Sequence, residues 1–336
     1  MTSIALALLL ATAPPGALSK TPPAPIDFGA VTMTLEPKDN RTFLDGDVWL
    51  QRFDLRVTGK KAVAEFGQPE EQPKPKSKVK KPAEPKPAER GLTSFVIDGA
   101  VHVERPSPAT SRTADGDHAV YDGPAQTLLL TGAPATPPPF LASVVGPVLR
   151  EGKELMVGER VLLHLDTDEV EVLKPRLFLN RSLPGIGAEN KDPKAQAAPV
   201  RVESGTLRLD QQRKVARFRE RCVVHRGDLT VRSPRMDARY DDKGELTTLQ
   251  FRGGVTMVEG DRRAVGKNAD YDASTRIFVL TGDPRLYDRG DVLRGDRIEM
   301  LLDTHEVKVN KAHGRLRPDQ HKDEQNLLGK KPEPKP

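Results

Sequence analysis

Polar and apolar residues alternate along most of the chain with a period of two. In the stretch Met236–Tyr240, apolar or small residues occupy every second position and charged residues lie between them. A period of two places alternate side chains on opposite faces of a β-strand, so such segments are expected to form strands with one buried and one solvated face. Outside the N-terminal residues, no segment has a convincing pattern of an amphipathic helix. The predicted fold class is therefore all-β.

Short turn signals separate the predicted strands. Asp241–Gly244, Arg252–Gly254 and Thr281–Pro284 combine glycine or proline with polar residues. Signals of this kind recur after roughly eight to twelve residues, a spacing typical of sandwiches, barrels and solenoids built from short strands. The sequence thus predicts many short strands joined by tight turns.

The chain also aligns with itself. Leu44–Phe66 aligns without gaps on Phe218–Tyr240, and Leu92–Val103 aligns on Leu246–Met257. Shorter blocks follow in the same order, with their apolar positions preserved. They are His118–Asp122 on Asn268–Asp272, Leu130–Gly132 on Leu280–Gly282, and Leu165–Val172 on Leu302–Val309. Ordered matches of this kind indicate an internal duplication. We therefore expect one module at residues 26–179 and a second at 200–318, joined by a polar linker at 184–199.

The two predicted modules differ mainly by insertions in the first. Residues 67–91 are rich in Pro, Lys and Glu, a composition typical of a disordered, locally extended segment. A second insertion, around residues 135–150, contains an apolar run that suits either a contact patch or an ordinary hairpin extension. The C-terminal residues 319–336 are expected to form a disordered tail.

The N-terminus has the pattern of a secretory signal. Ile4–Ala13 is apolar but too short to span a bilayer, and Ala17-Leu18-Ser19 provides a small-residue cleavage site. Met1–Ser3 lacks the usual basic residue. Residues 1–19 are predicted to be a signal peptide, and the rest of the chain to be a soluble, extracytoplasmic protein.

Amino-acid composition narrows the expected partners and the kind of core. The chain has 53 Lys and Arg against 48 Asp and Glu, a net charge of +5, and these charges are interleaved through most of its length. Interleaved charge is typical of a solvated face, so nucleic acid is not an expected partner. Aromatic residues make up only 4%, which favours thin sheets over one large core.

Candidate catalytic chemistry is missing from the sequence. The seven histidines show no metal-ligand spacing, and His102 and His118 align with Thr256 and Asn268 of the other module. The single cysteine, Cys222, aligns with a valine and is expected to be a buried apolar residue. No phosphate-binding loop or nucleophile motif is present. We expect no catalytic residue, no metal and no cofactor, and thus no enzyme.

The order of short motifs in Gly205–Pro318 resembles the OstA-like domain of the LptA-type periplasmic lipopolysaccharide-transport family. The resemblance starts with a strand near Glu220–Val224 and continues through a series of degenerate motifs. These are Ala238–Asp241, Ala269–Asp272, Leu280–Pro284, Leu293–Ile298, Val307–Val309 and Gly314–Pro318. The first module is a looser version of the same pattern, and the presence of two modules departs from the usual single one.

The resemblance implies two tandem open, twisted β-jellyroll modules that are able to stack into one continuous groove. It also implies a bridge component that shields the acyl chains of lipopolysaccharide in an apolar interior on their way to the outer membrane. The partners implied are lipopolysaccharide or a similar glycolipid, and homologous inner-membrane and outer-membrane components that join by strand addition at exposed edges. The same edges would serve self-association.

The inward apolar positions of the predicted strands are our candidates for a lipid-binding groove. In the first module they are Val48, Leu50, Leu55, Val57, Phe95, Ile97, Val101, Val103 and Tyr121. In the second module they are Cys222, Val224, Leu229, Val231, Leu249, Phe251, Val255, Met257, Tyr271, Phe278 and Leu280. Each of these residues taken alone would suit an ordinary core, and only the set predicts a groove.

An alternative function uses the same strands without lipid. In it the chain is a non-catalytic structural or scaffold protein of the cell envelope, assembled by β-strand addition. A groove filled by large side chains would favour this alternative, whereas a continuous apolar trough would favour transport.

Overall fold

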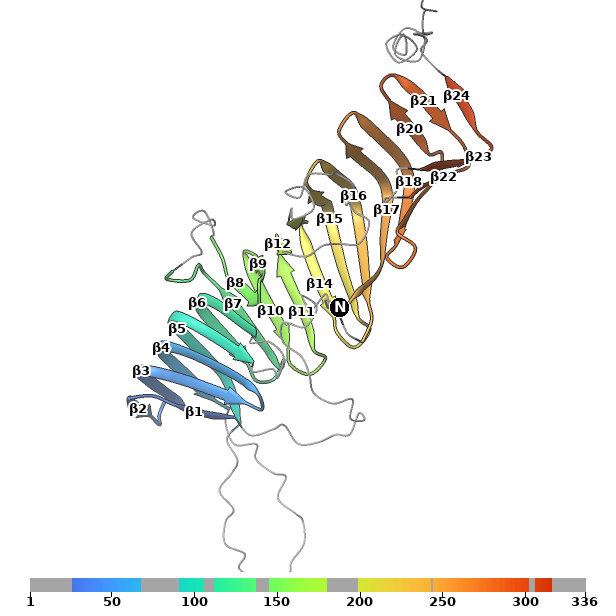
Figure 1. Ribbon diagram of the computed structural model, residues 1–336. Helices are drawn as coiled ribbons and strands as arrows, with labels where there is room; N and C mark the ends of the chain where they lie inside the picture. Colours follow the sequence, from blue (N-terminus) through green and yellow to red (C-terminus); the bar gives the residue numbers. More distant parts are fainter. Residues whose placement is uncertain are drawn as a thin grey trace, which may run out of the picture. The chain divides into compact units, whose positions relative to one another are not determined.

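A computed structural model describes seven parts of the chain. They are residues 26–67, 91–105, 112–136, 145–179, 199–242, 244–301 and 306–315. Every regular element in these residues is a β-strand, which confirms the predicted fold class (Figure 1). No described segment forms a helix that could span a membrane. The predicted signal peptide and tail, and nearly all of the 67–91 insertion and the 184–199 linker, lie outside the described residues, as do residues 137–144 of the second insertion.

The strands divide into two compact units, and the border between them in the sequence falls between Leu173 and Lys174. The first unit contains β1 (Asp27–Gly29), β2 (Thr32–Glu36), β3 (Arg41–Arg52), β4 (Leu55–Phe66), β5 (Leu92–Arg105), β6 (Arg112–Asp122), β7 (Thr127–Thr131), β8 (Val148–Glu151), β9 (Glu154–Val157), β10 (Arg160–His164) and β11 (Glu169–Leu173).

The second unit begins with β12, which pairs with β13 and so groups with it. Its strands are β12 (Arg176–Leu179), β13 (Val200–Glu203), β14 (Thr206–Asp210), β15 (Val215–Arg226), β16 (Leu229–Tyr240), β17 (Leu246–Glu259), β18 (Arg262–Asp272), β19 (Ile277–Thr281), β20 (Arg285–Asp288), β21 (Asp291–Arg294), β22 (Arg297–Leu301), β23 (Val307–Asn310) and β24 (His313–Arg315). The predicted module border at residue 179 stays a prediction.

In the second unit, four long antiparallel strands, β15–β18, take part in two layers at once (Figure 1). The first half of β15 pairs with β14, and its second half pairs with β13. At the other side, β19 pairs with the Asn268–Asp272 half of β18, whereas β20 pairs with the Arg263–Val265 half. Each long strand therefore crosses from one layer to the other and joins them along a common bend.

The bend is made by β-bulges. In β17 the register shifts between Arg252 and Val255, where Gly253 and Gly254 have φ of 92° and 102°. Two residues then face one, which bends the strand and increases its twist. Glycine adopts such angles without a Cβ penalty. The sequence predicted a turn between two strands here, and that interpretation was wrong, because the glycines lie inside one continuous strand. The Asp241–Gly244 turn is confirmed, with a 3.0 Å hydrogen bond from Gly244 N to Asp241 O.

The first unit is built in the same way. Its strands β3–β7 have 12, 12, 14, 11 and 5 residues, as do β15–β19. Bulges with positive φ occur at Gly46-Asp47 in β3 and at Gly99-Ala100 in β5. In the self-alignment of the sequence these positions match the bulges at Glu220-Arg221 and Gly253-Gly254. The two units thus share strand lengths, pairing order and bulge positions.

The core of each unit lies between its two layers. All twenty predicted inward residues are buried there, and the most exposed of them, Leu249, is 6% exposed. Phe251 and Val255, on either side of the bulge in β17, are both buried in this interior. The period-two pattern therefore identified the inward face correctly.

Candidate functional site

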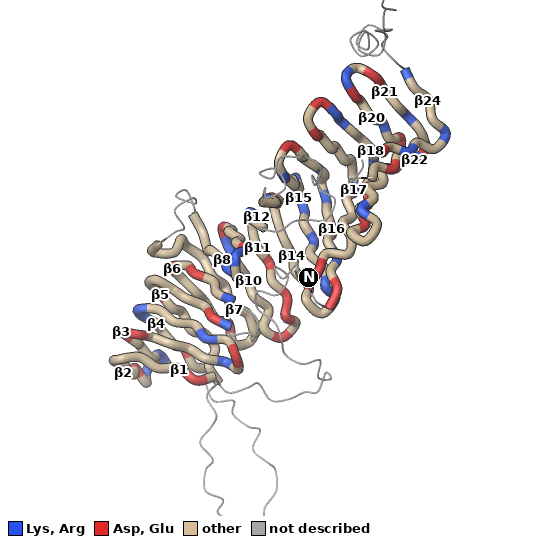
Figure 2. The backbone as a smooth tube through the Cα atoms, in the orientation of Figure 1, with Lys and Arg blue, Asp and Glu red and all other residues tan. Residues whose placement is uncertain are grey.

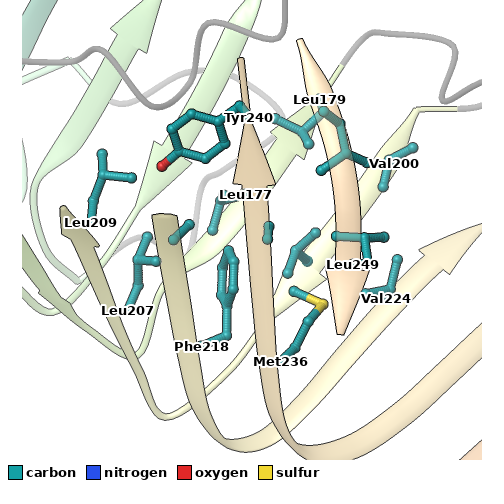
Figure 3. Close-up of a pocket in the computed structure, with 14 residues that line it drawn as sticks. Leu177, Leu179, Val200, Leu207, Leu209, Phe218, Val224, Met236, Tyr240 and Leu249 are labelled. Carbon is teal, nitrogen blue, oxygen red and sulfur yellow. The ribbon is translucent and has the colours of Figure 1, made fainter. Parts of the chain in front are cut away.

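A cavity of about 80 Å³ lies between the layers of the second unit (Figure 3). Thirteen of the fourteen side chains that line it are apolar, and the fourteenth is a tyrosine. They come from β12 to β17 and are Leu177, Leu179, Val200, Val202, Leu207, Leu209, Ala216, Phe218, Val224, Met236, Ala238, Tyr240, Leu246 and Leu249. Because the lining is apolar on both layers, the cavity suits an apolar occupant and not water.

The register of the strands explains why space remains here. Leu209 lies opposite Ala216, Ala216 opposite Ala238, and Ala238 opposite Leu249, so two small side chains stand next to each other in one row. Large residues at both ends hold the layers apart, and two alanines cannot fill the middle. The other layer covers the space with Val202, which pairs with Val224.

Tyr240 supplies the polar group of this cavity. Its hydroxyl is buried and makes no hydrogen bond within the described part of the chain. Burial raises the pKa of Tyr240 far above its ordinary value near 10, and the carboxylate of Asp210 raises it further. The hydroxyl therefore remains protonated.

The predicted candidates contribute little of the cavity wall. Val224 and Leu249 line it, and Met257 lines a smaller cavity of about 30 Å³ near β20 and β22. The other predicted residues are core residues, such as Phe251 and Phe278, whose ring centroids lie 5.9 Å apart. Alternation shows which side chains point inward, but it does not show where their volumes leave a gap. The two alanines at 216 and 238 were the feature of the sequence that could have indicated this gap.

The equivalent place in the first unit is filled by three phenylalanines. Phe28 pairs with Leu50 as Val202 pairs with Val224 in the second unit, and Phe95 pairs with Ala64 as Leu249 pairs with Ala238. Phe66 ends β4 as Tyr240 ends β16. The Phe28 ring centroid lies 6.1 Å from that of Phe66 and 5.6 Å from that of Phe95. We call these residues, Phe28, Phe66 and Phe95, the aromatic cluster.

A second contrast lies at the hairpin ends of the two units. In the first unit Arg112 and Glu151 form a buried ion pair at 3.2 Å. Nearby Arg105 lies 3.2 Å from Asp54, and burial lowers the pKa of its guanidinium. In the second unit the corresponding pair, Arg262 and Asp288, is more exposed at 2.9 Å, and Arg262 lines the smaller cavity. The first interior is thus closed more tightly than the second.

Charged residues of both signs lie along the long strands (Figure 2), and several of them form cross-strand pairs. Arg219 donates to Asp237, and Arg252 donates to Asp270 in the same manner. Two histidines of the first unit pair similarly, His102 with Asp115 and His118 with Asp98, both at 2.6 Å. No group of three or more His, Cys, Asp or Glu in the described residues could hold a metal ion.

Cys222 occupies the buried position that the alignment with Val48 predicts. Burial raises the pKa of its thiol to about 11. A thiol with such a pKa is protonated at neutral pH and is a poor nucleophile. Its environment therefore agrees with a structural role.

Comparison with known proteins finds a family match for part of the chain. The model of the LptA/(LptD N-terminal domain) LPS transport protein family matches residues 201–306. The LPS-assembly protein LptD of Pseudomonas syringae pv. syringae (strain B728a) is 33% identical over 75 residues, which are 22% of this chain and 8% of that protein. LptD of Pseudomonas savastanoi pv. phaseolicola (strain 1448A / Race 6) is 32% identical over the same shares. The chain spans less than a tenth of the length of these curated relatives.

Among solved structures, the chain is similar to LptH, the LptA homologous periplasmic component of the lipopolysaccharide transport device from Pseudomonas aeruginosa. The TM-score is 0.35 at 16% sequence identity, and the match covers 38% of this chain and 100% of LptH.

The fold and the cavity define an all-β protein with an apolar space between two layers. Residues 201–306 match the model of the LptA/(LptD N-terminal domain) lipopolysaccharide-transport family. This confirms the family that the motif order indicated. A family of transport proteins also agrees with the prediction that the chain is not an enzyme.

Proposed function

We propose that the chain is a periplasmic lipopolysaccharide-binding bridge component that shields acyl chains between its two β-layers on the way to the outer membrane. The observation that carries the proposal is the cavity of the second unit, most of whose lining lies within the residues that match the transport family. Tyr240 is the one polar side chain in that lining. An apolar space inside a member of a lipid-transport family is best explained by an apolar ligand.

The energetics of chain burial support this proposal. Each methylene group removed from water contributes about 0.8 kcal/mol. An unfilled apolar cavity destabilises the protein that contains it by roughly 24 cal/mol per Å³. A ligand chain that enters the space therefore gains from its own burial and restores contacts that the protein lacks.

We further propose that the two units are copies of one module. Equal lengths of β3–β7 and β15–β19 and matching bulge positions support the duplication. In this proposal the single chain contains two consecutive modules of a bridge, so it needs fewer partners than a single-module protein. Mass measurement on the purified protein tests this. We expect short assemblies, and long concentration-dependent chains would contradict the proposal.

We also propose that partner components join at exposed strands. In the described part of the chain β2 pairs with β3 alone, and all five of its residues are exposed. Val31 beside it is 74% exposed and Leu35 within it is 67% exposed. A strand with free backbone groups and apolar side chains is suited to β-augmentation by a homologous protein or by a second copy.

The scaffold alternative gains support from one observation. The aromatic cluster packs the interior of the first unit at the place where the second unit has its cavity. A packed interior favours a structural role for that unit.

Site-specific photocrosslinking in cells tests the proposed function. A photoreactive benzoylphenylalanine at Met236, which lines the cavity, is expected to form an adduct with lipopolysaccharide. The matched control is the same amino acid at Arg235, the neighbouring exposed position, whose side chain points to the opposite face. Equal adduct yields at the two positions, or none at either, would contradict binding between the layers.

A further inference from the structure

We propose that the two units have different roles, with an acyl-binding site in the second unit and an aromatic plug in the first. The proposal rests on the proposed function in that it takes the interior to be the place where apolar chains bind. It adds that Val202, Tyr240 and Leu249 create the site, and that their counterparts Phe28, Phe66 and Phe95 close it.

Strand register establishes that these residues are counterparts. Phe95 and Leu249 each lie opposite an alanine, Ala64 and Ala238, on the preceding long strand. Phe66 and Tyr240 each end that strand after a register shift. The side chains therefore start from equivalent backbone positions and point into the interior at the same place in each unit. The difference in filled volume between the two interiors then comes from the side chains.

The aromatic cluster fills its space through direct ring contacts. Phe95 is completely buried, and the Phe28 ring packs against it at a tilt of 58° and against Phe66 at 45°. Tilted pairs with centroids about 4.5–7 Å apart are favourable aromatic contacts. An acyl chain would have to displace these rings to enter, which makes the first unit a poor competitor for ligand.

The same positions in the second unit leave room. Valine and leucine replace two of the rings, and the space that remains measures about 80 Å³. That is about half the volume of an apolar protein cavity that takes up benzene. It fits a segment of one unbranched alkyl chain and does not fit a bulky ring system.

The lining gives the site its chemical preference. The Tyr240 hydroxyl is buried behind this lining and has almost no surface in the cavity. The ligand class is thus a linear acyl chain bound through apolar contacts.

A binding titration with dansyl-labelled undecanoic acid tests the proposal on the full-length mature chain. The wild type is expected to bind one equivalent of probe. Val202→Phe with Leu249→Phe, which introduces the residues of the first unit, is expected to weaken binding by about tenfold or more, because several methylene contacts are lost. The reverse double variant, Phe28→Val with Phe95→Leu, is expected to raise the stoichiometry to two equivalents.

If the double variant of the second unit fails to fold, Ala238→Leu fills the same cavity from β16 and is expected to weaken binding similarly. Fluorescence of the single tryptophan, Trp49, reports that the first unit remains folded.

The outcomes distinguish this inference from the proposed function. Two equivalents bound by the wild type, or unchanged binding by folded Val202→Phe/Leu249→Phe, would overturn the division of roles while leaving lipid binding intact. A wild type that binds no probe, together with no lipopolysaccharide adduct at Met236, would overturn both.

Discussion

The two units share a backbone plan and differ in the volume that their side chains leave inside. Both bend their long strands at bulges in equivalent positions, Gly99-Ala100 in the first unit and Gly253-Gly254 in the second. The aromatic cluster packs the first interior, whereas a cavity of about 80 Å³ remains in the second. Alternation and bulges therefore set the architecture, and a few substitutions at inward positions set whether a ligand can enter.

The outer faces also differ. Arg219, Arg235 and Arg252 of the second unit lie opposite one another along one cross-strand row. The corresponding row of the first unit contains Asp45, Lys61 and Asp98. Arg219 and Arg252 are balanced by Asp237 and Asp270, so the like charges are held apart by individual ion pairs. The two units thus differ on the outer face as well as on the inner face.

The largest effect is expected from truncation of the aromatic cluster. Phe95→Ala removes a fully buried ring and should lower the free energy of unfolding by about 3–5 kcal/mol. Its counterpart Leu249→Ala should cost about 2 kcal/mol, at the low end of such changes, because Leu249 already borders unfilled space. Urea denaturation followed by circular dichroism measures both. Equal losses would indicate that the two interiors are packed alike.

The bulges offer a second test of the shared plan. Gly254→Ala places a side chain at φ 102°, outside the left-handed region that non-glycine residues tolerate, and should cost about 1–3 kcal/mol. An added Cβ meets no atom within 4 Å there, so the loss would come from the backbone. The control is Ala100→Gly at the equivalent bulge, where φ is 52° and the change should stay within about 1 kcal/mol. Chemical denaturation of the two variants gives the comparison, and a tolerated alanine at 254 would contradict this geometry.

A smaller effect of opposite sign is expected from filling the cavity. At about 24 cal/mol per Å³, about 80 Å³ corresponds to roughly 2 kcal/mol of recoverable stability. Leu249→Phe should recover about 1 kcal/mol of this, since the shape of one ring does not match the whole space. Thermal unfolding by calorimetry detects the gain. A destabilised Leu249→Phe would mean that the space between the layers is not available to an added side chain.

The smallest effect concerns pH and is confined to the first unit. A hydrogen bond from His102 to Asp115 raises the pKa of His102 above its usual value near 6.5. A raised pKa in the folded state means that this stabilisation is complete below about pH 6.5 and is lost as the pH rises through the folded value. The second unit has Thr256 and Val265 at these positions and lacks the effect. His102→Thr should therefore flatten the dependence of the melting temperature on pH, and an unchanged profile would contradict it.

Much of the fold could be predicted from the sequence, because a period of two marks the face of each strand. The twenty residues predicted in this way to face inward, from Val48 to Leu280, are all buried. The bulges were less accessible, since Gly253-Gly254 is as suitable for a turn as for a bulge. Strand pairing distinguishes a bulge from a turn here, because both halves of β17 pair with the same two strands, β16 and β18.

The cavity was harder to predict for a different reason. Its wall combines strands from β12 to β17. The register of these strands decides whether Leu209, Ala216, Ala238 and Leu249 form one row, and the register cannot be read from the sequence. Tyr240 was aligned with Phe66, but the loss of two neighbouring rings becomes visible only when Phe28 and Phe95 are seen beside Phe66.

The most direct test of the central claim compares equivalent positions of the two units in one crosslinking experiment. Benzoylphenylalanine is placed at Met236 in the second unit and, in a separate variant, at its counterpart Ala62 in the first. Adducts with lipopolysaccharide are then quantified in living cells. We predict a clear adduct from Met236 and little or none from Ala62. Equal adducts from both positions would contradict the difference between an open and a plugged interior, and an adduct from Ala62 alone would reverse it.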